Sequence, residues 1–186
     1  MTEKKVTGDK PVKKKPINSK SKGSGFEGQT AKKLSAALPI NFIRSPGSGA
    51  RIGGKNFATV GAIMGEEVMK LFNADVVPVN EEAEGYTFRF SVECKFYKEA
   101  DNFTSLASGT ANLFKWFQES VIDSAKIGRE PVLIFKWNRT PTFVATLAGA
   151  RPNPPLLSIK NSDLSLDIYD FDEVLKDQDF WVTKKQ

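Results

Sequence analysis

The sequence predicts an α/β fold, with a central mixed β-sheet flanked by helices, and three patterns lead to this prediction. Residues 87–96 alternate between apolar and polar side chains, as in a strand that buries one face. Apolar residues recur at helical spacing both before and after that strand. Residues 131–137 are apolar except for Lys136, which predicts a further strand.

The first predicted helix runs from Ser24 to about Leu38. Ser24-Gly-Phe-Glu27 fits a capping box, the stripe that begins at Phe26 recurs every fourth residue, and Pro39 ends the helix. The next segments are predicted, in chain order, to be a short strand, a loop, an ambiguous stretch, one or two helical turns and a second strand, at residues 40–44, 45–50, 51–64, 66–72 and 75–79.

Residues 87–96 are the clearest predicted strand, with Phe88, Phe90, Val92, Cys94 and Phe96 on one face and Arg89, Ser91, Glu93 and Lys95 on the other. A helix follows and ends at Gly128; its buried stripe is Leu106, Thr110, Leu113, Phe114, Phe117 and Val121. Trp116 and Phe117 lie on this amphipathic helix, which favours packing in the core or in a dimer over base stacking. Strands at 131–137 and 142–147 complete the sheet.

The composition excludes several classes of protein. The 186 residues, 40% of them hydrophobic, suffice for one folded domain, and no apolar run approaches the roughly 20 residues that span a bilayer. We therefore expect no membrane association, and the Lys-rich start lacks the apolar stretch of a secretory signal. Cys94 is the single cysteine, so no intramolecular disulfide can form. The absence of histidine excludes Ser-His-Asp and Cys-His catalysis and His-containing zinc sites.

Charge is concentrated at the two ends of the chain. Residues 1–23 hold eight lysines against two acids, a net charge of +6, so the rest of the chain sums to −1. We interpret this segment as a disordered basic arm whose lysines, Lys13, Lys14 and Lys15 among them, bind DNA phosphates; a solubilising tail is the alternative. Residues 24–186 would form one domain, with a core over about 24–147 and an acidic strand and helix extension over 148–186. The acids of Asp170-Phe-Asp172 there favour a helix start over a metal cluster.

The polar face of the 87–96 strand carries the candidate chemistry. Glu93 and Lys95 project from the same side, and Asp75 lies on the neighbouring predicted strand. Two nearby carboxylates repel one another unless a cation lies between them, and oxygen ligands without histidine favour Mg²⁺, for which Mn²⁺ can substitute. The lysine would neutralise charge that develops on a phosphate, so these are the parts of a histidine-free phosphodiester hydrolysis. Taken alone, Glu93 and Lys95 could instead be an exposed ion pair.

Three stretches extend this pattern along the chain. They are residues 23–34 with Glu27, residues 42–50 with the sequence Phe-Ile-Arg-Ser-Pro-Gly-Ser-Gly-Ala, and residues 90–95 with Phe-Ser-Val-Glu-Cys-Lys, followed by Trp116-Phe-Gln118 and residues 131–136. Together they resemble the PD-(D/E)xK nuclease superfamily, and more closely its archaeal and bacteriophage Holliday-junction resolvases. The resemblance covers about residues 23–147. It implies a restriction-endonuclease-like core and a Mg²⁺-dependent endodeoxyribonuclease that acts on branched DNA, above all a four-way junction.

The resemblance also implies a role for each matched residue. Asp75 and Glu93 would ligate the metal, Cys94 would add its backbone carbonyl, and Lys95 would orient the attacking water and stabilise the transition state. Glu27 would complete the outer shell of the metal, and its alternative role is the capping box. Arg44, Ser45 and Ser48 would contact the DNA backbone near the scissile phosphate, although their loop could also be an ordinary turn-rich loop. Gln118, on the helix after the motif, would help to position the DNA.

The chain departs from the superfamily pattern at two places. Ala74 stands where the motif has proline, and about two dozen residues separate the Ser-Pro-Gly-Ser-Gly loop from Asp75, so Glu66 and Glu67 compete with Asp75 as ligand. Symmetrical cutting of two strands implies a homodimer, and a phage origin would place the enzyme in the host cytoplasm. The alternatives are another PD-(D/E)xK DNA nuclease of restriction, nicking or recombination type, or a non-catalytic nucleic-acid-binding protein driven by the basic arm.

Overall fold

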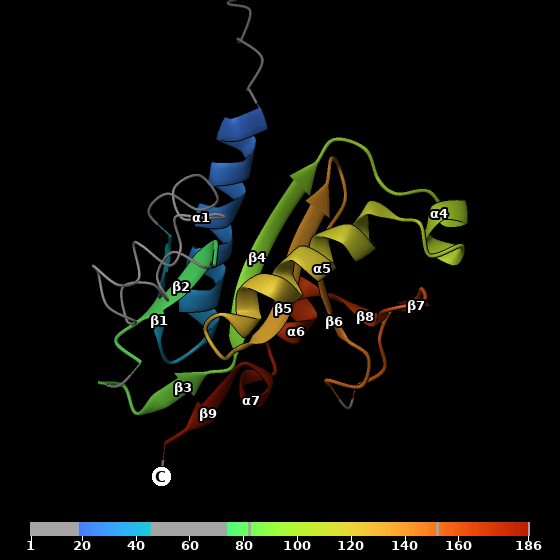
Figure 1. Ribbon diagram of the computed structural model, residues 1–186. Helices are drawn as coiled ribbons and strands as arrows, with labels where there is room; N and C mark the ends of the chain where they lie inside the picture. The colour runs from blue at the N-terminus through green and yellow to red at the C-terminus, as the bar shows by residue number, and fades with distance from the viewer. Residues whose placement is uncertain (1–18, 46–73, 82, 152, 186) are drawn as a thin grey trace, which may run out of the picture.

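The computed structural model describes residues 19–45, 74–81, 83–151 and 153–185 (Figure 1). Its seven-stranded sheet has the order β1-β2-β4-β5-β6-β8-β7. These strands are β1 (Asn41–Arg44), β2 (Val76–Val79), β4 (Phe90–Tyr97), β5 (Glu130–Trp137), β6 (Thr142–Leu147), β7 (Leu157–Lys160) and β8 (Ser165–Asp170). β4 and β5 are parallel, and the other neighbouring pairs are antiparallel. The predicted mixed sheet is therefore confirmed.

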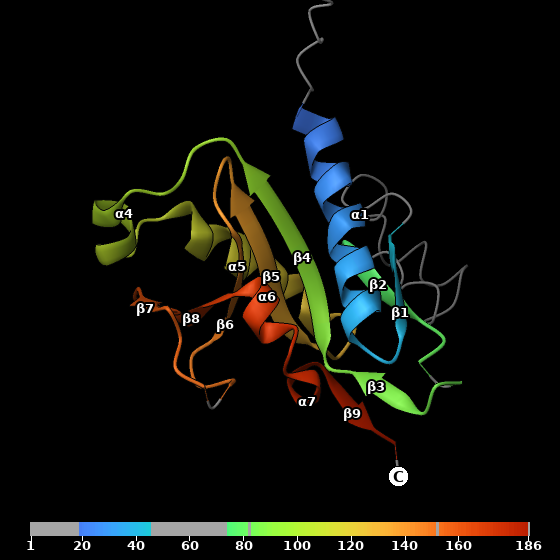
Figure 2. The ribbon, with the colours of Figure 1, turned by 180° about the vertical axis from the view of Figure 1, so that it is seen from behind.

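Helices cover both faces of the sheet. On one face lie α1 (Ser19–Ala37), α6 (Phe171–Val174) and α7 (Gln178–Trp181), which pack on one side of β4 and β5 (Figure 2). On the other face lies α5 (Asn112–Ala125), which crosses β4 and β5 (Figure 1). Apolar side chains of β5 alternate between these two cores, because successive residues of a strand point to opposite faces. This arrangement places β4, with Glu93 and Lys95, at the centre of the molecule.

The first helix begins earlier than predicted. α1 starts at Ser19, so residues 19–23, which we expected in the disordered arm, are helical. The predicted capping box is wrong, because the hydroxyl of Ser24 donates to the carbonyl of Ser21 from within the helix. Burial of Phe26 and Leu34 against the sheet explains why a helix that carries glycines still forms. The rest of the expected arm lies outside the described residues.

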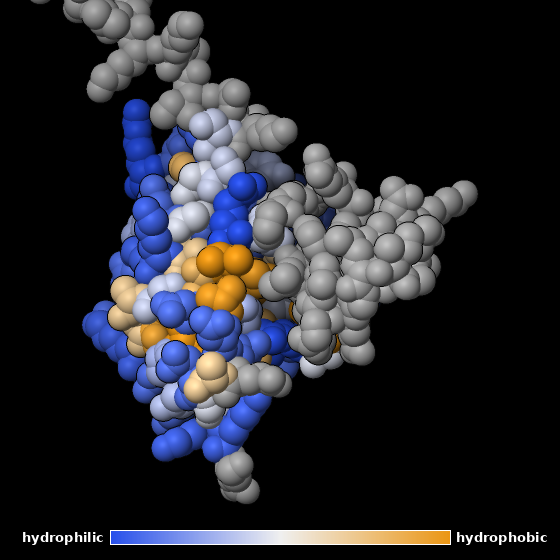
Figure 3. Space-filling model, turned by 90° about the vertical axis from the view of Figure 1, so that its left-hand side faces the viewer, coloured by the Kyte–Doolittle hydropathy of each residue, from blue (hydrophilic) through white to orange (hydrophobic). Residues whose placement is uncertain are grey.

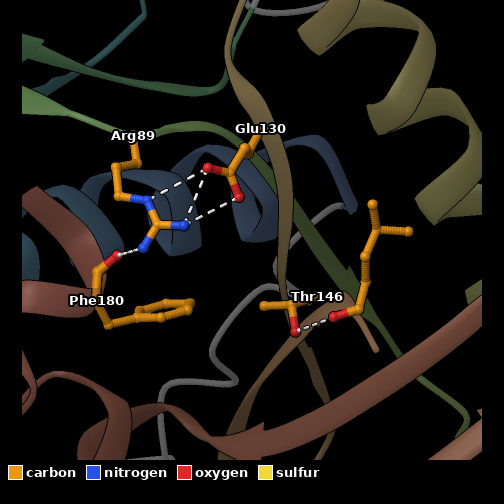
Figure 4. Close-up of polar contacts among 5 residues, drawn as sticks. Arg89, Glu130, Thr146 and Phe180 are labelled. Carbon is orange, nitrogen blue, oxygen red and sulfur yellow. Dashed lines mark hydrogen bonds and ion pairs between the residues drawn. The ribbon is translucent and has the colours of Figure 1, made fainter. Parts of the chain in front are cut away.

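The predicted strand at 87–96 is two strands. β3 (Tyr86–Phe88) pairs with β9 (Val182–Lys184) in a separate two-stranded sheet, and β4 begins at Phe90. Arg89, at the break, donates to the carboxylate of Glu130 and to the carbonyl of Phe180 (Figure 4). Arg89 thus ties the start of β4 to β5 and to the C-terminal segment.

The predicted helix before residue 128 is also interrupted. α4 (Phe103–Ala107) and α5 are separated by Gly109, whose φ of 74° favours glycine. A Cβ atom on Gly109 would lie 2.8 Å from the Cβ of Asn161, so the close approach of the chain also requires glycine. Asp101 accepts hydrogen bonds from the backbone N–H groups of Asn112 and Leu113 and so caps α5.

The acidic C-terminal segment folds as predicted, into strand β8 followed by helix α6. The side chain of Asp170 accepts from the N–H groups of Asp172 and Glu173, which confirms that these acids begin a helix. None of the described helices is long and apolar enough to cross a bilayer. On the face in Figure 3, an apolar area lies near the centre, with hydrophilic side chains above and below it.

Candidate active site

Asp75 is held by backbone contacts beside the middle of β4. Its N–H donates to the carbonyl of Val92 at 2.9 Å, and its carbonyl accepts from the N–H of Ser45 at 2.9 Å. Its side-chain Oδ2 accepts from the N–H of Cys94 at 2.8 Å. As the sequence predicts, Asp75 therefore lies next to the strand that carries Glu93, and contacts from two directions fix its position.

Glu93 and Lys95 project together from the face of β4 that α5 covers. Lys95 Nζ lies 2.7 Å from Glu93 Oε1, and the two side chains are only 22% and 19% exposed. An ion pair on a fully exposed surface would contribute almost nothing to folding stability, whereas this pair is largely shielded from water. Because an ion pair of this burial costs free energy to desolvate, its presence in the centre of the fold makes Glu93 and Lys95 candidates for a functional site.

The two carboxylates hold their protons unusually firmly. Burial, then the charge of Glu93 and more weakly that of Glu27, raise the pKa of Asp75 to about 8 against the opposing hydrogen bond from Cys94. Burial also raises the pKa of Glu93, and nearby Asp123 and Glu119 add to this effect, while Lys95 opposes it. Without a bound cation, burial and mutual repulsion therefore disfavour the state in which Asp75 and Glu93 are both charged.

Lys95 remains a cation throughout the neutral range. Burial alone would lower its pKa, but Glu93 and Glu119 outweigh burial and raise the pKa of Lys95 to about 12. Glu119 lies on α5 with its Oε2 at 3.6 Å from Lys95 Nζ. Our sequence reasoning missed Glu119 and Asp123, which lies one turn further along α5. Their spacing of four marks a polar stripe in the sequence, but only the packing of α5 on β4 turns Glu119 toward Lys95.

Glu27 and Arg44 form a second charged pair, near Asp75. Arg44 Nε donates to Glu27 Oε2 at 2.5 Å, and this joins α1 to the end of β1. Glu27 is 13% exposed and Arg44 40% exposed, so Arg44 is the more exposed partner of the pair. Glu27 also raises the pKa of Asp75, though less than burial and Glu93 do, so α1 brings its carboxylate near Asp75; its role in an outer metal shell stays a prediction.

Oxygen donors at this point suit a hard divalent cation. Asp75 and Glu93 supply carboxylates, and in extended backbone the carbonyl of Cys94 points to the same side as its N–H, which faces Asp75. Within the described ranges no three carboxylate or thiol side chains gather to hold an ion. An ion here would complete its shell with water, as Mg²⁺ commonly does. The donor set of two carboxylates and a carbonyl therefore fits Mg²⁺ better than a metal that needs a closed protein cage.

The other residues that the sequence suggested for the site are buried, exposed or outside the described ranges. Ser45 is buried and its N–H anchors Asp75, so its contact with DNA stays a prediction. Gln118 is exposed on α5 beside Glu119. Burial, followed by the charges of Asp75 and Glu93, raises the pKa of the Cys94 thiol far above its ordinary value, so this thiol is no nucleophile. The expected residues that lie outside the described ranges are Ser48, Glu66, Glu67, Lys13, Lys14 and Lys15.

Comparison with known families agrees with this geometry. A family described as "Phage putative PDDEXK endonuclease" matches residues 18–171, most of the chain. The chain belongs to this endonuclease family. The matched span includes Asp75, Glu93 and Lys95, whose assignment to the D, the D/E and the K of the motif stays a prediction, as does the replacement of the motif proline by Ala74. The endonuclease thus has the restriction-endonuclease-like fold that its mixed sheet and flanking helices predict.

Two further comparisons, with curated proteins and with solved structures, add little to the family match. No curated protein matches the sequence of the endonuclease. Among solved structures, Hjc of the archaeal hyperthermophile Archaeoglobus fulgidus, a Holliday junction resolvase, is similar to it at 15% sequence identity and a TM-score of 0.39, over 82% of this chain and 86% of that one.

Proposed function

We propose that this endonuclease hydrolyses phosphodiester bonds of branched DNA, and four-way junctions above all, in a Mg²⁺-dependent reaction. The observation that carries the proposal is the meeting of Asp75, Glu93 and Lys95 at the middle of β4, with both carboxylates short of water. The preference for junctions rests on the resemblance of residues 42–50 to the loop of junction resolvases.

In this proposal Asp75, Glu93 and the Cys94 carbonyl would hold the Mg²⁺. When bound, such a cation polarises a phosphate and lowers the pKa of an attacking water. Asp75 and Glu93 are well suited to this role, because a cation between them relieves the repulsion that raises the pKa of Asp75. Asp75 would not have to move to bind the cation, since backbone hydrogen bonds already fix its position.

Lys95 acts as a permanent cation in this mechanism. With a pKa of about 12 it stays protonated near neutral pH, so it cannot take a proton from the attacking water. Its ammonium can instead donate hydrogen bonds to a phosphate oxygen and neutralise the charge that builds up in the transition state. Arg44, which is 40% exposed and pairs with Glu27, would bind a neighbouring phosphate.

Two further parts of the proposal concern the whole assembly. Cutting a junction symmetrically requires two active sites, which a homodimer with two-fold symmetry provides. The lysines of residues 1–18 would bind the phosphates of a second DNA arm. Selection of the junction would come from the shape of the DNA and the positions of its phosphates.

The test uses a labelled four-way junction and a linear duplex of the same sequence, each with Mg²⁺ and with EDTA. Lys95→Ala and Glu93→Gln should still bind the junction but cut it at least a hundredfold more slowly. Glu99→Gln is the matched control, because Glu99 is an exposed acid just beyond β4. Normal cutting by both site variants would refute the site, and equal cutting of junction and duplex would refute the junction preference.

A further inference from the structure

The catalytic face of β4 continues past Lys95 to an aromatic side chain. Side chains two residues apart on a strand share a face, so Glu93, Lys95 and Tyr97 form one row beside α5. Glu93 and Lys95 are about four-fifths buried, whereas Tyr97 is 48% exposed. The row therefore opens to solvent at the C-terminal end of β4, roughly 7 Å beyond Lys95.

A stacking contact on its ring holds Tyr97 in place. Its ring stacks on that of Trp116 from α5, with the centroids 4.4 Å apart and the planes at 24°. Trp116 is 6% exposed, so the support behind Tyr97 is part of the core. The exposed part of Tyr97 is thus a preorganised aromatic surface that loses little conformational freedom when something stacks on it.

A nucleobase suits this surface better than an aliphatic partner does. In the proposed function Lys95 lies at the scissile phosphate, and Tyr97 lies two residues further along β4. The base of the next nucleotide of an extended DNA strand can reach from that phosphate to Tyr97. Nucleobases stack on aromatic side chains with little regard to sequence. In continuous duplex both faces of each base are already covered, so a free base face exists only where stacking is interrupted.

We propose that Tyr97, supported by Trp116, is a stacking subsite for an unstacked nucleobase beside the phosphate that is cut. The subsite rests on the proposed function, and it states what the enzyme recognises in branched DNA. The interior of a linear duplex offers no such base, whereas the exchange point of a junction or a flap does. The subsite therefore favours branched over linear DNA without reading any base edge.

The test measures binding in EDTA, where no cutting takes place, with 2-aminopurine at the exchange point of a four-way junction. Stacking quenches the fluorescence of this base analogue. Tyr97→Leu should bind the junction about tenfold more weakly and lose the quenching, with duplex binding unchanged, while Tyr97→Phe keeps both. Phe103→Leu is the control, since Phe103 is an exposed aromatic on α4, outside the row. Circular dichroism checks that each variant is folded.

Each other outcome overturns the subsite. Retained quenching in Tyr97→Leu would show that the base does not stack on Tyr97. An equal loss of junction and duplex binding would show a general effect on DNA contact. A change of oligomeric state in light scattering, with quenching intact, would show that a second copy of the chain covers Tyr97. Failure of the proposed function is distinguishable, because it would leave Lys95→Ala cutting normally whatever Tyr97 does.

Discussion

Replacing Asp75 by asparagine should stabilise the metal-free protein, although it removes a proposed metal ligand. The pKa of the folded-state carboxyl is about 8, against an ordinary value of 3.8. Between these values the unfolded chain has released a proton that the folded chain retains, so stability falls as pH rises from about 4 to about 8. Asparagine cannot titrate, and its Oδ1 can still accept from the N–H of Cys94.

The size of this effect follows from the pKa difference. At about 1.4 kcal/mol per pH unit, a wholly buried carboxyl would lose about 6 kcal/mol over this range. Water reaches part of Asp75, and part of the shift comes from its repulsion with Glu93. We therefore expect the free energy of unfolding to fall by about 3 kcal/mol. In a domain of this size that corresponds to about 6–12 °C in Tm.

Urea denaturation in EDTA from pH 4 to pH 9 measures this. Asp75→Asn should match the wild type near pH 4 and exceed it by about 3 kcal/mol at pH 9, and added Mg²⁺ should stabilise only the wild type. Asp163→Asn, at an exposed position, is the control and should follow the wild type throughout. A difference between Asp75→Asn and wild type that is the same at pH 5 and pH 9 would refute the argument from burial and repulsion.

Four further changes have defined expected results. Glu119→Gln should lower kcat about two- to fivefold with KM unchanged, and Glu119→Asp should restore part of it, because one ion-pair partner of Lys95 is lost; an unchanged kcat would remove Glu119 from the site. Arg89→Ala should lower the free energy of unfolding by about 1–2 kcal/mol in urea while the folded fraction cuts normally. Gly109→Ala should cost about 1–3 kcal/mol in the same assay, as its φ of 74° and crowded Cβ position require. Deleting residues 1–18 should leave cutting intact but reduce the slope of log affinity against log salt by up to about 5, as measured by binding titrations.

The central strand and its site could be predicted from local pattern. Alternation placed Glu93 and Lys95 on one face of a strand, and the structure shows both there with Asp75 alongside. The same alternation misled at Arg89, because Phe88 and Phe90 are both buried on either side of a change of sheet. That break depends on β9, which lies some 90 residues further along the chain, so no local pattern contains it.

The start of α1 escaped prediction for a related reason. Its first turns are rich in lysine, serine and glycine, and glycine is a poor helix former, so propensity alone favours a later start. The helix is stabilised by Phe26, Ala31, Leu34 and Leu38 against β1, β2 and β4, a tertiary effect. Glu119 was missed although its helix was predicted, because only the packing of α5 on β4 turns that carboxylate toward Lys95.

The contact between Asp75 and β4 gives the Asp75 carboxylate a structural role besides its proposed role as a metal ligand. Within the described residues, β2 and β4 share the single register pair Val76 and Val92, and the N–H of Cys94 is satisfied by the Asp75 carboxylate in place of a strand carbonyl. An apolar residue at position 75 would orphan that N–H at a cost of about 1–3 kcal/mol, which would hide any gain from removing the charge. Asparagine keeps the hydrogen bond, so it separates the structural duty of Asp75 from its electrostatic one. The Asp75 carboxylate that holds the sheet together at this point is also a proposed ligand of the cation, so metal binding at Asp75 would be linked to folding stability.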